Sequence, residues 1–196
     1  MDPVSDCTAV ILAGGESRRM GSDKAGTLLH GKTLLQHVLE QIQPLFSDIV
    51  VSVREFRDDV VSPQIIDSSH DRGPMVGIQA VLEQVSTPWV FVIGCDMPFV
   101  SAPLIRLLEA KRESHDAVVT HVFDRPQPLF GFYAKSCLPM MGERIAQGQR
   151  SMIRLLDALN SCMVAELQVR EVDPQLRSLM SLDTIEDVKR MEQRDE

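Results

Sequence analysis

Short apolar runs alternate with stretches of helical periodicity along most of this chain, and this alternation limits the possible folds more than any other feature. The run Trp89–Gly94 is β-branched, aromatic and uncharged, which is typical of a buried strand. Leu34, Leu35 and Val38 recur at helical spacing, and Pro44 discourages continuation of that helix. Strands that alternate with helices predict an α/β fold, here a single three-layer domain with a mostly parallel sheet.

The predicted elements cover most of the chain. Strands are predicted at 9–12, 49–53, 65–66, 89–94, 117–120, 129–133 and 163–167, and helices at 33–43, 75–85, 104–111, 138–147, 151–159 and 185–193. Thr184, with Asp187 three residues later, is predicted to cap the last helix. The domain is expected to cover residues 1–196, with loose ends at 1–6 and 194–196.

Composition is ordinary for a globular protein with one full core. Of 196 residues, 44% are apolar and 24% are charged. No apolar run approaches the roughly 20 residues that a membrane span needs, and the acidic start of the chain does not resemble a secretory signal. The four cysteines are scattered, which predicts reduced thiols and neither a disulfide nor a zinc site. These features favour the cytoplasm.

The net charge is −8, whereas a nucleic-acid-binding protein usually carries a basic excess or stripe. An anionic ligand would therefore need a local cluster of cations. Such a cluster lies in Leu12–Lys24, directly after the first predicted strand, where three glycines accompany Arg18, Arg19 and Lys24. The backbone N–H groups of a glycine-rich turn form an anion site, and the three cations add positive charge to it.

We interpret Leu12–Lys24 as a loop that binds a polyphosphate. It has neither the Gly-Lys-Ser/Thr ending of a P-loop nor the Gly-x-Gly-x-x-Gly spacing of a dinucleotide fingerprint. The alternative interpretation is a glycine-rich surface turn with solvated charges.

Asp96 follows the clearest predicted strand, so we expect its carboxylate to lie at the same edge of the sheet as the glycine-rich loop. A carboxylate beside a polyphosphate is repulsive unless a cation lies between them. Mg²⁺ commonly binds through one or two carboxylates together with substrate phosphates. We therefore predict that Asp96 is a magnesium ligand. The alternative is an aspartate that begins a turn before Pro98.

The pattern Leu-Ala-Gly-Gly-x-x-x-Arg-Met-Gly-x-x-Lys, from Leu12 to Lys24, resembles the signature loop of pyrophosphorylase-type nucleotidyltransferases. It is most similar to that of the molybdenum cofactor guanylyltransferases. Cys95–Pro98 resembles the metal motif of that family, and Gly73–Ile78 resembles a turn that opens one of its helices. The resemblance spans roughly residues 8–190. It implies the Rossmann-like nucleotidyltransferase fold.

The resemblance also implies roles for individual residues. Lys24, Arg19 and Asp96 would be catalytic, and Asp96 would hold Mg²⁺. Asp67 falls where the family has a carboxylate at the nucleotide site, although a turn residue is an alternative interpretation. Ser52 stands where many relatives have asparagine. The implied GTP-binding set is Leu12, Ala13, Gly14, Gly15, Arg19, Lys24, Ser52, Asp67 and Asp96.

The implied acceptor side consists of Arg150, Ser181 and Asp183, and here the chain departs from the family. Ser181 and Asp183 replace two asparagines, and Ile185 replaces a proline. Asp183 keeps the capacity to bind metal, so it is a candidate second Mg²⁺ ligand. Arg150 could instead be a solvated residue at a helix start. Related cytidylyltransferases often have aspartate near position 183, but they usually carry Leu-Ala-Ala-Gly where this chain has Leu-Ala-Gly-Gly, which favours guanine.

The implied reaction is transfer of GMP from GTP to molybdopterin in its molybdenum-bearing form, which gives the guanine dinucleotide cofactor and pyrophosphate. GTP and molybdopterin would be the substrates, without nucleic acid or membrane, and a molybdoenzyme or its chaperone is a candidate protein partner. Three alternatives stay open. They are a cytidylyl- or sugar-nucleotide transferase on the same scaffold, a non-catalytic nucleotide-binding adaptor, and a structural partner that delivers the cofactor.

Overall fold

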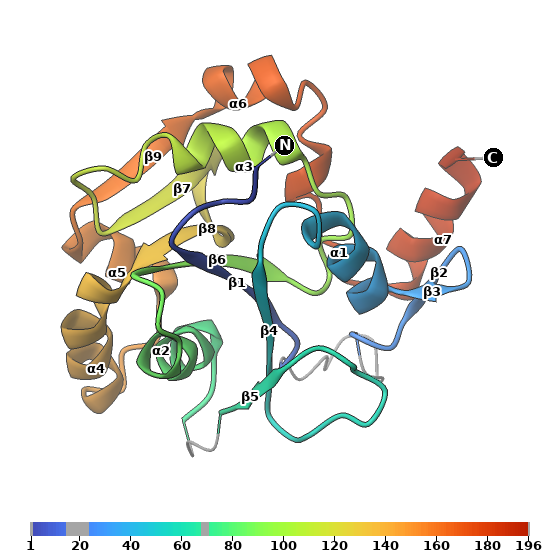
Figure 1. The fold of residues 1–196 in the computed structure, drawn as a ribbon. Coiled ribbons are helices and arrows are strands. Elements are labelled where there is room, and N and C mark those ends of the chain that lie inside the picture. Colours follow the sequence, from blue (N-terminus) through green and yellow to red (C-terminus); the bar gives the residue numbers. More distant parts are fainter. Residues whose placement is uncertain (1, 15–23, 68–70, 196) are drawn as a thin grey trace.

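The computed structural model describes residues 2–14, 24–67 and 71–195 (Figure 1). Among them, seven strands form one sheet in the order β5-β4-β1-β6-β8-β7-β9. The long β8 is antiparallel to both of its neighbours, and all other pairs in the sheet are parallel. The strands are β1 (Cys7–Leu12), β4 (Asp48–Val53), β5 (Gln64–Ile66), β6 (Trp89–Gly94), β7 (Ala117–Val122), β8 (Arg125–Ala134) and β9 (Ser161–Ala165).

Helices cover both faces of this sheet, so the expected three-layer α/β architecture is confirmed. One face packs against α1 (Leu34–Ile42), α3 (Ala102–Glu109) and α6 (Glu166–Val172). The other packs against α2 (Pro74–Gln84), α4 (Leu138–Ala146) and α5 (Met152–Ala158). A further helix, α7 (Ile185–Asp195), lies apart from the sheet (Figure 1).

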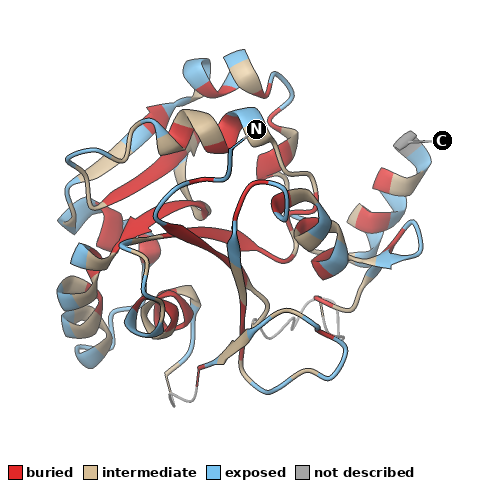
Figure 2. Ribbon diagram, in the orientation of Figure 1, coloured by how far each residue is buried: buried red, intermediate tan, exposed pale blue. Residues whose placement is uncertain are grey.

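The central strands are apolar throughout because they are buried on both faces. In β1, Ala9 and Ile11 point into the core on one side, whereas Val10 points into the core on the other. In β6, Phe91 and Val92 alternate in the same way. Figure 2 shows these strands as the buried centre of the molecule.

A short hairpin, β2 (Leu28–Leu29) and β3 (Lys32–Thr33), packs with α7 in a third, smaller apolar cluster. The buried members of this cluster are Leu29, Leu34, Leu182, Val188 and Met191. The C-terminal segment is thereby held against the region that follows the glycine-rich loop (Figure 1).

The helix caps agree with the sequence. Thr33 and Gln36 form a capping box at the start of α1, which ends at Ile42, two residues before Pro44. Thr184 and Asp187 form the expected reciprocal pair before α7, with the Asp187 N–H donating to Thr184 Oγ1 at 3.1 Å and the Thr184 N–H donating to Asp187 Oδ2 at 2.9 Å.

The prediction of a strand over 163–167 was wrong at its C-terminal end. The strand covers Ser161–Ala165, and Glu166–Val172 forms α6, which the sequence analysis did not predict. Only Val169 of α6 is buried, so its apolar pattern is too short to indicate a helix. The hairpin was also missed, because its strands have two residues each.

The N-terminal residues are not all loose. Val4 is buried, and its backbone N–H donates to the carbonyl of Leu45 at 2.8 Å. The chain is therefore anchored before β1 begins. The four cysteines are free thiols, as expected. None of the helices in the described ranges has the length and apolar character that crossing a membrane requires.

Candidate active site

The site lies where parallel strands end together. Leu12, the last residue of β1, is in register with Ser52 of β4 on one side and with Gly94 of β6 on the other. Two backbone hydrogen bonds continue this pairing beyond the strands. The Ala13 N–H donates to the Ser52 carbonyl at 2.9 Å, and the Cys95 N–H donates to the Leu12 carbonyl at 3.2 Å. The glycine-rich loop therefore starts between the ends of β4 and β6.

Three charged side chains meet on the β6 side. The Lys24 ammonium donates to Asp96 Oδ2 at 3.0 Å and to Asp183 Oδ1 at 2.5 Å. Asp96 follows β6, and Asp183 precedes α7, so the fold joins residues that are far apart in sequence. Ser181 Oγ donates to Asp183 Oδ2 at 2.8 Å. The segment is tied down further by the Leu182 N–H, which donates to the Asp96 carbonyl at 2.8 Å.

The Lys24 ammonium is held in its charged form. Partial burial lowers its pKa, but hydrogen bonding to Asp183 and the charge of Asp96 outweigh this effect, so the pKa of Lys24 is raised. The side chains of Lys24 and Asp96 are each 19% exposed, and that of Asp183 is 41% exposed. The site remains open to solvent and is therefore accessible to a ligand.

The two carboxylates fit a divalent cation. Asp96 and Asp183 already share one cation, the Lys24 ammonium, between them. Oxygen ligands from one or two carboxylates, completed by phosphate and water, are the usual environment of Mg²⁺. Within the ranges that the structure describes, no group of three or more histidine, cysteine or acidic side chains gathers as a metal site. Asp96 and Asp183 are the two carboxylates at this cluster that could ligate a cation bound together with a substrate.

A second polar group lies on the β4 side. Asp67, directly after β5, is only 6% exposed, and its N–H donates to the Val53 carbonyl at 2.9 Å. Arg54 Nη1 donates to Asp67 Oδ2 at 2.9 Å. Ser52 is also buried, and its hydroxyl faces Gly77 of α2, where an added Cβ would lie 2.9 Å from Ser52 Oγ. Ser52 and Asp67 were predicted from the sequence as site residues, whereas Arg54 was not. Arg54 lies two residues after Ser52 at the same strand end, and this position could have identified it as a candidate site residue.

The remaining predicted site residues do not belong to the Lys24 cluster in the structure or lie outside the described residues. Arg150 forms an ion pair with Asp71. In the part of the chain that the structure describes, it contacts neither Ser181 nor Asp183. Gly14 packs beside Arg54, and an added Cβ there would lie 3.1 Å from Arg54 Cγ. Gly15, Arg18 and Arg19 lie outside the described residues, so their predicted roles stay predictions.

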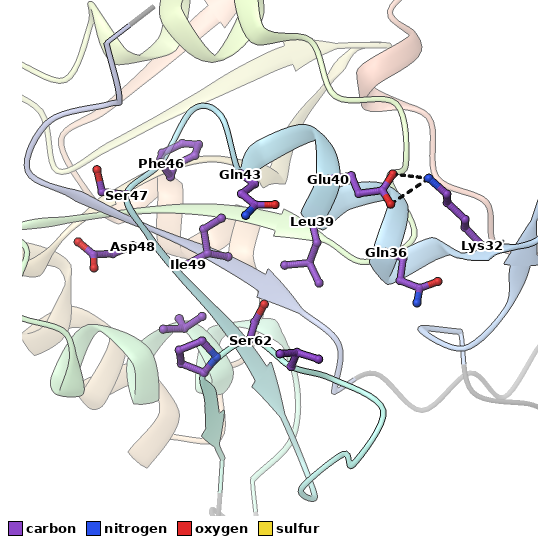
Figure 3. A pocket seen from close by; sticks show the side chains of 13 residues that line it. Lys32, Gln36, Leu39, Glu40, Gln43, Phe46, Ser47, Asp48, Ile49 and Ser62 are labelled. Carbon is purple, nitrogen blue, oxygen red and sulfur yellow. Dashed lines mark hydrogen bonds and ion pairs between the residues drawn. The ribbon is translucent and has the colours of Figure 1, made fainter.

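A separate cavity of about 660 Å³ lies between α1, the amino end of β4 and residues 61–63 (Figure 3). Lys32 and Glu40 form an ion pair at its edge. Among the predicted site residues that the structure describes, none lines this cavity. Parallel sheets bind ligands at the carboxyl ends of their strands, and the cavity adjoins the opposite end of β4.

A mostly parallel sheet, a glycine-rich sequence after β1 and a lysine that contacts one aspartate after β6 and another before α7 are the arrangement of a nucleotide-binding α/β enzyme. Residues 9–162 match the family model described as the MobA-like NTP transferase domain. The chain belongs to this family of nucleotidyltransferases. Enzymes of the family generally use a divalent metal ion.

Curated relatives and solved structures agree with this assignment. The chain is 33% identical to the molybdenum cofactor guanylyltransferase of Syntrophotalea carbinolica, over 93% of this chain and 89% of that protein. It is 31% identical to the probable molybdenum cofactor guanylyltransferase of Methanosarcina mazei, over 94% and 89% of the two chains. The crystal structure of molybdopterin-guanine dinucleotide biosynthesis protein A from Archaeoglobus fulgidus superposes with a TM-score of 0.85, at 29% identity, over 96% of this chain and 98% of that one.

Proposed function

We propose that this protein transfers GMP from GTP to molybdopterin in a magnesium-dependent reaction, forming the guanine dinucleotide cofactor and pyrophosphate. The names of its relatives support this substrate pair. The single observation that carries the proposal is the contact of Lys24 with both Asp96 and Asp183 at the strand ends. This contact supports the proposal because a cation that could bind phosphate oxygens lies beside two carboxylates that could hold a metal ion.

In the proposed reaction, an oxygen of the terminal phosphate of molybdopterin attacks the α-phosphorus of GTP. A new phosphorus–oxygen bond forms, the bond to the bridging oxygen of the β-phosphate breaks, and pyrophosphate leaves. The attacking phosphate is already anionic, so no side chain has to act as a general base. Catalysis then depends on positioning the two substrates and on neutralising charge.

Lys24 would exchange its present partners for the triphosphate. Its ammonium is bonded to two carboxylates, and phosphate oxygens can take the place of those acceptors. Arg19 would hold the triphosphate from the other part of the loop. Once Lys24 turns away, Asp96 and Asp183 would hold Mg²⁺, which when bound supplies charge neutralisation at the α-phosphoryl group.

The β4 side would bind the guanosine part of GTP. The backbone of Leu12, Ala13 and Gly14 lies beside Ser52 at the strand ends, where it could read the guanine edge. The carboxylate of Asp67 would take part in binding the nucleotide on this side. On the acceptor side we assign Ser181 and Asp183, which lie at the Lys24 cluster. Arg150 was expected with them, but it pairs with Asp71, whose carbonyl accepts from Arg54, so it lies on the β4 side instead.

A nucleotide-by-metal screen tests the proposal. The melting temperature of the protein is measured with GTP, CTP, ATP or UTP, each with and without Mg²⁺. At about 100 times the Kd, a ligand stabilises by about 2.7 kcal/mol, which for a chain of this size is roughly 5–10 °C. We expect such a shift for GTP with Mg²⁺ and smaller shifts for the other nucleotides.

Turnover is then measured as pyrophosphate release with molybdopterin present, and the product is identified by mass. A shift with CTP alone would favour the cytidylyltransferase alternative. A shift with GTP but no pyrophosphate release would favour the adaptor. Either result would contradict the proposed function.

A further inference from the structure

Arg54, which directly follows β4, contacts the segment that follows β5 on the nucleotide side. Its Nη1 donates to Asp67 Oδ2 at 2.9 Å and to the backbone carbonyl of Asp71 at 2.9 Å. The Asp67 side chain is 6% exposed, whereas that of Arg54 is 31% exposed. A carboxylate that is buried to this extent is costly without a charged partner. The Arg54 guanidinium therefore stabilises the buried Asp67 side chain at the end of β5.

The stem of Arg54 also packs against the start of the glycine-rich loop. A Cβ built on Gly14 would lie 3.1 Å from Arg54 Cγ and 3.4 Å from the Arg54 backbone nitrogen. Gly14 thus lets the loop pass close to the Arg54 stem. One side chain contacts Gly14 after β1 and Asp67 after β5, while its own backbone follows β4.

These contacts lie on one side of β1. Ser52 of β4 pairs with Leu12 on that side, whereas Gly94 of β6, which leads to Asp96, pairs with Leu12 on the other. Changing Arg54 should therefore disturb the surface that holds the nucleotide without displacing the Lys24–Asp96–Asp183 cluster.

We propose that Arg54 is a positioning residue for nucleotide recognition, acting by fixing the Asp67 carboxylate and the path of the loop at Gly14. This inference rests on the proposed function, because it assigns the β4 side to GTP. It predicts an effect on the affinity for GTP and not on the chemical step. The residue acts through Asp67 and is not itself placed in contact with the reacting atoms.

The test compares Arg54→Met and Arg54→Lys with Arg57→Met. Arg57 pairs with Asp59 on the same connection between β4 and β5, and Asp59 is 58% exposed, so this pair is a matched control of the same chemistry. GTP binding with Mg²⁺ is measured by calorimetry, and KM and kcat are measured separately. Melting temperatures without ligand show that each variant is folded.

Loss of a hydrogen-bonded charge pair should raise the Kd and the KM for GTP by about 10- to 100-fold in Arg54→Met, with kcat changed by less than about threefold. Arg54→Lys should recover part of the affinity, because it keeps a charged donor on a shorter stem. Arg57→Met should bind GTP like the wild type.

A double variant tests the route of the effect. If Arg54 acts through Asp67, adding Arg54→Met to Asp67→Asn should weaken GTP binding by much less than it does in the wild type. Wild-type affinity in a folded Arg54→Met protein, or a fully additive double variant, would overturn the inference while leaving the proposed function standing. A wild-type protein that binds no GTP would overturn both.

Discussion

Lys24 is the residue on which the proposed site depends, because its ammonium lies between the two carboxylates that we propose as ligands of a divalent cation. Hydrogen bonds to both aspartates raise its pKa against the opposing effect of burial, so the charge persists at neutral pH. In the absence of nucleotide, Lys24 and a metal ion should therefore compete for the same carboxylates.

Lys24→Met tests this competition. Without the ammonium, Asp96 and Asp183 repel each other, so Mn²⁺, used as a probe for Mg²⁺, should bind nucleotide-free protein about tenfold or more tightly than it binds the wild type. Binding is measured by electron paramagnetic resonance of free Mn²⁺. Lys32→Met is the control, since Lys32 pairs with Glu40 on an exposed surface. Equal Mn²⁺ affinity in the wild type and Lys24→Met would contradict this account of Lys24.

At this scale, the sequence was sufficient to place Lys24 and Asp96 at the same edge of the sheet. Asp96 was expected at the edge where the glycine-rich segment ending at Lys24 begins, and the structure joins the two side chains at 3.0 Å. The position of Arg54 near Ser52 could have drawn attention to it, but its partners and the Arg150–Asp71 pair could not be predicted from the sequence. These contacts join side chains from separate elements, and a local sequence pattern does not predict such tertiary contacts.

Among the elements, those with a long apolar repeat were predicted well and those with few buried residues were not. The helix α1 buries Leu34, Leu35, Val38 and Ile42 at helical spacing, and β6 is buried from its second residue to its last, so both patterns were clear. The helix α6 buries one side chain, and the hairpin strands bury one side chain between them. The hairpin matters for function because it helps to hold α7, and α7 follows Asp183.

The contact between β8 and β7 provides a prediction about stability. An added Cβ on Gly131 of β8 would lie 2.6 Å from the Val118 carbonyl oxygen and 2.7 Å from Val119 Cγ1. Since backbone cannot move cheaply there, Gly131→Ala should lower the free energy of unfolding by about 1–3 kcal/mol. Chemical denaturation measures the change.

Gly142→Ala in α4 is the matched control. Its added Cβ would lie 3.5 Å from Gln79 Nε2, an ordinary contact, so better helix propensity should stabilise the protein by about 0.5–1 kcal/mol. If both substitutions had the same effect, the packing described for β7 and β8 would be incorrect.

The whole molecule is built as two cores on either side of one sheet, with the site at the edge where the parallel strands end. The layered architecture and the edge that carries the site could be predicted from the sequence, because strands that alternate with helices allow few arrangements. The departures of Ser181 and Asp183 from the family pattern concern only the segment before α7. There the structure keeps a carboxylate at the Lys24 cluster.

The two cores also bury acidic groups in neutral form, which predicts the dependence of stability on alkaline pH. Burial raises the pKa of Cys7 and of Cys137 to about 12, and it raises the pKa of Tyr133 well above its usual value. In the unfolded chain these groups lose their protons at lower pH than in the fold. The stability is therefore fully present below about pH 9 and is lost as the pH rises towards 12.

Denaturation at pH 8, 9, 10 and 11 measures this loss, and the variant Cys7→Ala/Cys137→Ala should show a shallower decline. A free energy of unfolding that stays constant from pH 8 to pH 11 would contradict the burial of these groups.

Pyrophosphate release by Asp96→Asn, with GTP, molybdopterin and Mg²⁺ supplied, is the most direct measurement of the central claim. The substitution keeps the shape of the side chain and removes its charge, so the protein should keep its melting temperature while kcat falls about 10²- to 10³-fold. Lys32→Met should release pyrophosphate at the wild-type rate. Near-normal turnover by folded Asp96→Asn would contradict the claim that the carboxylates at these strand ends organise the reaction.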